Sequence, residues 1–178
     1  MATLNNPFVI YGYKGSEYFC DREEETEKMI SALHNERNVT LVAPRRMGKT
    51  GLVKHVFAKM EKQDKDIKCF YLDIYPAKNL DQMVGMLGSE IIGNLDSVSQ
   101  AAMRRVQEFF SKWRPTLTID EVTGRPTFSL DIRPSEGRET LKQIFEYLGQ
   151  SGKRCYIAID EFQQILDFPE SGVEALIR

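Results

Sequence analysis

The stretch A-P-R-R-M-G-K-T, residues 43–50, decides how the rest of the chain is interpreted. It follows a short apolar run over residues 39–43 and precedes a segment whose apolar residues recur at helical spacing. Those apolar positions are Leu52, Val53, Val56, Phe57 and Met60. The pattern predicts a strand that ends in a loop, followed directly by an amphipathic helix.

This loop contains the residue types that phosphate binding requires. It matches the pattern G-x-x-x-x-G-K-[ST], except that Ala43 replaces the first glycine. In such a loop, backbone N–H groups and the positive end of the helix converge on phosphate oxygens. Gly48 permits close approach of the backbone, Lys49 reaches the terminal phosphates, and the Thr50 hydroxyl ligates Mg²⁺. The alternative is a chance Gly-Lys-Thr before a helix, and the flanking elements favour phosphate binding.

Two features of the loop leave alternatives open. Ala43 is harmless where φ is negative, and costs about 1 kcal/mol or more in the left-handed region. Arg45 and Arg46 contact either phosphate or a neighbouring subunit, or they stay in solvent as most loop arginines do. The loop residues expected to bind nucleotide are Pro44, Arg45, Arg46, Met47, Gly48, Lys49, Thr50 and Gly51.

A pair of carboxylates follows a second apolar run, near the end of the chain. Residues 156–159 are nearly all apolar, as in a parallel strand covered on both faces, and Asp160 and Glu161 come next. Ligands bind at the carboxyl ends of strands in open α/β sheets. We expect Asp160 to hold Mg²⁺ through its water shell and Glu161 to orient or deprotonate an attacking water. Capping of the next helix is the alternative, and the phosphate loop favours catalysis.

The remaining segments predict helices and strands with one interruption. An N-terminal arm over residues 1–20 precedes a helix for which Asp21 is the expected N-cap. The other expected elements are a strand over 67–75, helices over 80–95 and 98–113, a β-hairpin insertion at 115–133 and a helix over 136–150. Residues 162–178 have the apolar positions of about one further helix, among them Ile165, Leu166, Val173, Leu176 and Ile177.

Composition predicts one ordinary globular domain. The chain has 178 residues, of which 42% are hydrophobic and 28% charged, close to average usage. The net charge of −2 and the absence of a basic run leave nucleic-acid binding unsupported. Three widely spaced cysteines suggest reduced thiols in a cytosol. Because neither a secretory leader nor a long apolar segment occurs, we expect a soluble cytoplasmic protein without a membrane partner.

These residues resemble P-loop NTPases of the division with an extra central strand and a catalytic glutamate, related to AAA+ proteins. More narrowly, P-R-R-M-G-K-T with a downstream I-D-E-F-Q is similar to the AAA-type ATPase family described mainly from archaea, near the STAND signalling ATPases. The similarity spans most of the chain. It implies a three-layer αβα sandwich with a parallel core sheet, Walker A and Walker B motifs, ATP and Mg²⁺ as cofactors, and Lys49 and Glu161 as catalytic residues.

The resemblance extends upstream and then stops short. Residues 19–25 are similar to the family's F-x-x-R-x-x-E segment, which implies that Phe19 and Arg22 help to frame adenine; a capped helix start is the alternative. In the family, a sensor strand lies between the acidic strand and the phosphate-loop strand. The chain ends seventeen residues after Glu161, so we expect this strand, an arginine finger and the C-terminal lid to be missing. The chain then represents the N-terminal portion of an ATPase domain, with its effector domain elsewhere in the protein.

A missing strand has a physical consequence. Strands ending at residues 43 and 160 would lie about 10 Å apart with a vacant slot between them, since neighbouring strands are ~4.8 Å apart. Unpaired backbone there predicts self-association, or direct pairing of the two strands.

The leading hypothesis for function is an ATPase that couples turnover to conformational change in a remote effector. Alternatives are a nucleotide-binding switch with little turnover, an ATPase module of a nucleic-acid-acting protein, and an interaction scaffold that binds no nucleotide.

Overall fold

The computed structural model describes residues 12–95, 115–119, 126–130, 132, 134–170 and 172–173. By the contacts between its residues, the chain divides into two compact units, Met1–Cys69 and Phe70–Arg178. The sequence had predicted a single domain. The predicted helix over residues 98–113 lies outside the described residues. Among the described residues, no helix is both long and apolar enough to cross a lipid bilayer.

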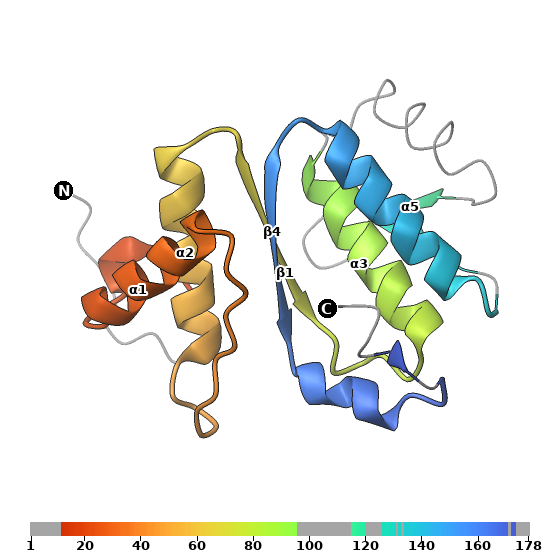
Figure 1. Cartoon of the computed structure of the whole chain (residues 1–178), viewed down its shortest axis with the longest axis horizontal. Helices are drawn as coiled ribbons and strands as arrows, with labels where there is room; N and C mark the ends of the chain where they lie inside the picture. The colour runs from red at the N-terminus through yellow and green to blue at the C-terminus, as the bar shows by residue number, and fades with distance from the viewer. Residues whose placement is uncertain are drawn as a thin grey trace. The chain divides into compact units, whose positions relative to one another are not determined.

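The first unit is helical. A short 3₁₀ helix η1 (Ser16–Tyr18) is followed by helices α1 (Glu23–His34) and α2 (Lys49–Gln63), which pack against each other (Figure 1). The residues predicted to form the apolar face of α2 are all buried, namely Leu52, Val53, Val56, Phe57 and Met60. The predicted amphipathic helix is therefore confirmed, and it begins within the stretch 43–50, at Lys49.

The start of α1 differs from the prediction. The N-cap is Arg22 rather than Asp21, and no side chain caps the helix. Both residues have left-handed backbone, with φ of 58° at Asp21 and 68° at Arg22. A capping side chain needs an extended backbone at the N-cap, so this geometry excludes the usual cap. The glutamates of the first turn still place negative charge at the positive end of the helix.

The strand predicted over residues 39–43 does not form. Residues 37–44 have no regular secondary structure, and the side chain of Val42 is 91% exposed. A strand is stabilised only when a neighbour satisfies its backbone N–H and C=O groups, and no described strand pairs with this segment. Ala43 is not among the residues with positive φ, so the lack of glycine at this position introduces no backbone strain.

Most of the sheet belongs to the second unit, since only residues 67–69 of it lie before the start of that unit. Strands β1 (Ile67–Asp73) and β4 (Arg154–Asp160) form a two-stranded parallel sheet. The other elements are helix α3 (Leu80–Leu95), strands β2 (Pro115–Ile119) and β3 (Pro126–Leu130), helix α5 (Gly137–Gln150) and the 3₁₀ helix η2 (Phe162–Asp167). The chain is thus α/β, compatible with part of an αβα sandwich. Strands β2 and β3 form the predicted antiparallel hairpin, with Pro115 opposite Leu130.

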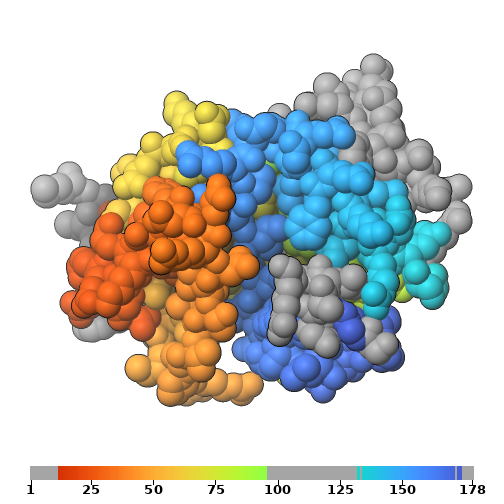
Figure 2. Space-filling view, viewed as in Figure 1, coloured from red at the N-terminus to blue at the C-terminus, as the bar shows by residue number. Residues whose placement is uncertain are grey.

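Helices α3 and α5 lie side by side and build the core of the second unit (Figure 1). Their buried faces include Val84 and Ile91 of α3 and Leu141 and Ile144 of α5. Phe145 was predicted on the apolar face of α5, but 45% of its surface is exposed. The outward surface of α5 is visible in Figure 2 as a cyan to light-blue band.

Two predictions for the C-terminal part are wrong. Strand β4 is half-buried from Cys155 to Asp160, so it is not covered on both faces as its apolar sequence predicted. The segment after Glu161 is the 3₁₀ helix η2 rather than an α-helix, and Leu166 within it is 76% exposed. Ile165 and Val173 are buried as predicted, whereas Leu176 and Ile177 lie outside the described residues.

Candidate functional site: a phosphate loop and an acidic strand end

Residues 43–50, called the phosphate loop below, turn sharply before α2. Arg46 has φ of 65°, and Gly48 has φ of 70° and ψ of 22°, so both lie in the left-handed region. Glycine adopts this conformation freely, whereas arginine there costs ~1–2 kcal/mol. Strained residues of this kind concentrate at functional sites. The sharp turn lets the helix begin at Lys49.

This turn leaves peptide donors without partners. Within the part of the chain that the structure describes, the backbone N–H groups of Arg46, Gly48 and Lys49 donate no hydrogen bond. Further along α2, the N–H of Leu52 donates to the Gly48 backbone oxygen at 2.9 Å. Unpartnered amides at a helix N-terminus, where the helix dipole is positive, are the groups that bind anions.

The lysine of the motif lies on the loop itself. The Lys49 ammonium donates hydrogen bonds to the backbone oxygens of Ala43 at 2.8 Å and Pro44 at 3.2 Å. An ammonium group has three N–H donors, so one donor remains for an anion. The motif therefore places a positive charge beside the unpartnered amides.

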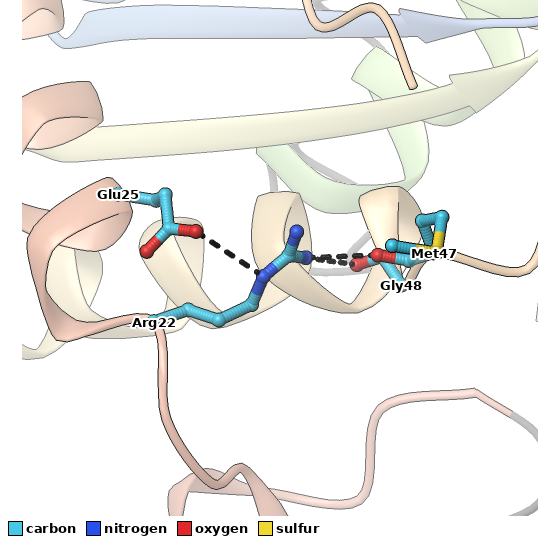
Figure 3. Close-up of polar contacts among 4 residues, drawn as sticks. All are labelled: Arg22, Glu25, Met47 and Gly48. Atoms are coloured by element: carbon cyan, nitrogen blue, oxygen red, sulfur yellow. Dashed lines mark hydrogen bonds and ion pairs between the residues drawn. The ribbon is translucent and has the colours of Figure 1, made fainter. Parts of the chain in front are cut away.

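The predicted Arg22 also contacts the phosphate loop. Its Nη1 atom donates to the backbone oxygens of Met47 at 3.0 Å and Gly48 at 3.4 Å, as Figure 3 shows. On its other side, Nε lies 3.6 Å from a carboxylate oxygen of Glu25. The side chain is only 30% exposed. The structure thus brings Arg22 to the loop.

An aromatic cluster holds the N-terminal segment on α2. The Phe19 ring stacks on the His55 ring with centroids 4.1 Å apart and an interplanar angle of 11°. The Tyr13 hydroxyl lies 3.1 Å from His55 Nδ1, within hydrogen-bonding distance. Burial lowers the pKa of His55, and the Lys59 ammonium lowers it further, whereas Glu23 has the opposite effect. Burial also raises the pKa of Tyr13.

The aspartate at the end of β4 is held by its neighbours. Asp160 Oδ2 accepts a hydrogen bond from the Tyr71 hydroxyl of β1, and Oδ1 accepts one from the Glu161 N–H at 2.9 Å. The Asp160 backbone oxygen accepts from the N–H of Ile74 at 3.2 Å, just beyond β1. Side chain and backbone are therefore fixed at the carboxyl end of the sheet.

The following glutamate has an unusual backbone. Glu161 has φ of 55° and is the N-cap of η2, but its side chain makes no capping hydrogen bond. Its Oε2 atom instead accepts a hydrogen bond from Nε2 of Gln163. The Glu161 side chain therefore does not cap η2. The left-handed backbone of a non-glycine residue here parallels that of Arg46 in the loop.

A magnesium ion fits this chemistry only with help from a nucleotide. The described residues contain no group of three or more His, Cys, Asp or Glu side chains that could hold a metal alone. Mg²⁺ commonly takes one or two protein oxygens and completes its shell with water and phosphate. Thr50 in the first unit and, separately, Asp160 in the second each carry a side-chain oxygen of the kind that such an ion takes.

Comparison with known proteins yields no match to any family model, curated protein or solved structure. The sequence pattern had predicted a role for the loop, Arg22, Asp160 and Glu161, and that role stays a prediction. Tyr71 and His55 were not predicted, because neither lies in a recognisable pattern. Tyr71 contacts Asp160, and His55 contacts Tyr13 and Phe19, all of which are distant in sequence.

Proposed function

We propose that the chain binds ATP together with Mg²⁺ through the phosphate loop, and that the protein hydrolyses the nucleotide. One observation supports this most strongly: the unpartnered N–H groups of Arg46, Gly48 and Lys49 lie at the N-terminus of α2, beside the Lys49 ammonium. The loop also carries three cationic side chains and no acidic one. This combination suits a polyphosphate better than a carboxylate or a neutral ligand.

Three parts of the loop have a role in this proposal. The amides bind phosphate oxygens, Lys49 neutralises charge at the terminal phosphates, and the Thr50 hydroxyl contributes an oxygen to Mg²⁺. Bound Mg²⁺ would stabilise negative charge that develops on the phosphoryl group in the transition state. Because the Asp160 carboxylate already accepts two hydrogen bonds, it suits an outer role, contacting the metal's water shell.

Glu161 is the residue we propose as the general base. A carboxylate next to the metal-binding aspartate can orient a water molecule and accept its proton. This role requires release of the hydrogen bond that Gln163 donates to Glu161.

The test is phosphate release by the full-length protein. We expect Glu161→Gln to reduce turnover at least ~100-fold, while affinity for ATP stays within about threefold of the wild type. Glu146→Gln, which alters an exposed glutamate of α5, serves as the matched control and should leave turnover unchanged. Unchanged turnover in Glu161→Gln would remove Glu161 from the mechanism.

A nucleotide-binding switch with little turnover is the second candidate. The hydrogen bond from Gln163 to the Glu161 carboxylate favours it, because a carboxylate held in this way is less available to activate water. Tight ATP binding without measurable phosphate release would support the switch. Appearance of turnover in Gln163→Ala would indicate that this hydrogen bond restrains the base.

A further inference from the structure

Arg22 forms hydrogen bonds with two peptide groups of the phosphate loop. Its Nη1 atom donates to the backbone oxygens of Met47 and Gly48 (Figure 3). We infer that Arg22 is a positioning residue, which orients the phosphate-binding amides by holding the carbonyl ends of their peptides. This inference depends on the proposed phosphate-binding function of the loop.

Peptide geometry connects these carbonyls to the binding amides. A trans peptide is planar, and its C=O and N–H bonds point in opposite directions. The Met47 oxygen shares a peptide with the N–H of Gly48, and the Gly48 oxygen shares one with the N–H of Lys49. Both N–H groups are among the donors without partners in the described residues. The guanidinium therefore holds one end of each peptide while the other end remains available to an anion.

The positive charge of Arg22 should also strengthen these donors. A cation at a carbonyl oxygen polarises the peptide, which increases the partial positive charge on its N–H. The hydrogen bonds from the charged guanidinium to the two carbonyl oxygens are themselves about twice as strong as neutral ones, which keeps the peptides in place. Arg22 thus contributes to anion binding through the loop backbone, without touching the phosphate.

The structure fixes Arg22 well enough for this task. Its backbone oxygen accepts a hydrogen bond from the N–H of Thr26 at 2.9 Å, which ties it to α1. Glu25 contacts the opposite edge of the guanidinium. Three residues earlier, Phe19 stacks on His55 of α2. The segment that carries Arg22 is consequently attached to both helices of the first unit.

This role differs from the one that the family resemblance implies. A residue that frames adenine affects only ligands with a base. A residue that orients the loop amides affects every ligand with a polyphosphate group, whether or not it carries a base. The two roles are therefore separated by comparing ATP with inorganic tripolyphosphate.

The experiment is calorimetric titration of Mg²⁺-ATP and Mg²⁺-tripolyphosphate into the full chain. Arg22→Asn is the best truncation, because asparagine tolerates left-handed backbone and is too short to reach the loop. We expect it to weaken both ligands by a similar factor of about ten, equivalent to ~1.4 kcal/mol. Arg22→Lys retains the charge, and should recover affinity to within about threefold of the wild type. Arg37→Asn, at an exposed arginine after α1, controls for net charge and should change neither affinity.

A second readout separates positioning from general stabilisation. In the wild type, pyrophosphate should shift the amide proton resonances of Gly48 and Lys49, and Arg22→Asn should reduce both shifts at equal saturation. Thermal unfolding identifies a variant that has lost its fold. In that case Arg22→Gln, which also removes the charge, replaces Arg22→Asn and should reduce the same two shifts, and undiminished shifts would overturn the inference.

The outcomes are distinct. A loss confined to ATP would assign Arg22 to the base, and unchanged affinity in Arg22→Asn would remove its role; either result overturns the inference while leaving the proposed function intact. Failure of the wild type to bind either ligand would overturn the proposed function and, with it, this inference.

Discussion

The phosphate loop presents hydrogen-bond donors without partners, whereas the acidic end of β4 presents acceptors that are already bonded. The N–H groups of Gly48 and Lys49 donate no hydrogen bond within the described residues, while both carboxylate oxygens of Asp160 accept one. The loop is therefore prepared to bind an anion directly. The strand end is prepared to hold one carboxylate in a fixed orientation, which suits contact with a metal through water. Changes in the loop should thus affect binding, and changes at the strand end should affect turnover.

Gly48→Ala should have the largest effect on the loop. At φ of 70° an alanine is strained by ~1–2 kcal/mol, and relief of that strain would move the amides away from the phosphate. We expect roughly a 100-fold loss of ATP affinity in calorimetric titration, together with a lower melting temperature. Gly149→Ala is the matched control, because a Cβ on that residue of α5 meets no atom within 4 Å and alanine favours a helix. Equal affinities for Gly48→Ala and the wild type would show that ATP binding does not depend on the left-handed backbone at Gly48.

At the strand end, Tyr71→Phe should have an intermediate effect. Removal of the hydroxyl deletes the hydrogen bond to Asp160 Oδ2 while the aromatic ring remains in place. We expect turnover to fall about tenfold, as for other residues that orient metal ligands, with ATP affinity measured in EDTA unchanged. Tyr75→Phe, at an exposed tyrosine just after β1, should leave both quantities unchanged. If Tyr71→Phe weakened metal-free ATP binding instead, the division of labour between loop and strand end would be wrong.

The smallest expected effect is the change of stability with pH. It concerns only the unit that contains the phosphate loop. Because burial lowers the pKa of His55 in the folded protein, the unfolded chain binds a proton more readily as the pH falls. The contribution of neutral His55 to stability is therefore present above its unfolded pKa of about 6.5 and is lost as the pH falls through the folded pKa. Thermal unfolding at pH 7.5 and 5.5 should show a larger decrease for the wild type than for His55→Phe, which keeps the stack on Phe19.

The second histidine provides a control for this pH dependence. His34 is exposed at the end of α1, and His34→Gln should preserve the decrease seen in the wild type. Identical pH dependence in the wild type and His55→Phe would show that His55 does not link stability to protonation.

Local patterns predicted most helices and strands correctly. The periodic apolar residues of α2 and α5 identify a buried face regardless of what packs against it, so spacing alone was sufficient. The prediction of a strand over residues 39–43 was wrong, because a strand, unlike an amphipathic helix, needs a partner strand. This segment is as apolar as residues 156–159, but β4 has β1 while residues 37–44 have no described strand beside them. Self-association through unpaired backbone stays a prediction.

The candidate site was predictable where its chemistry is contiguous in sequence. The phosphate loop and the Asp160-Glu161 pair each occupy neighbouring positions, so residue type and order were enough to propose them as a site. The supporting residues were not predictable, because Tyr71 reaches Asp160 across 89 positions and Tyr13 reaches His55 across 42. The left-handed backbone at Arg46 and Glu161 was also hidden, since neither residue type favours it.

Calorimetric titration of ATP into the chain and its Lys49→Ala variant tests the central claim most directly. Lys49→Ala removes the ammonium group next to the unpartnered amides and leaves the apolar face of α2 intact. The proposal predicts Mg²⁺-dependent binding of ATP by the wild type, with affinity at least ~100-fold lower in the variant. The absence of binding by the wild type, or equal affinities for the two proteins, would contradict it.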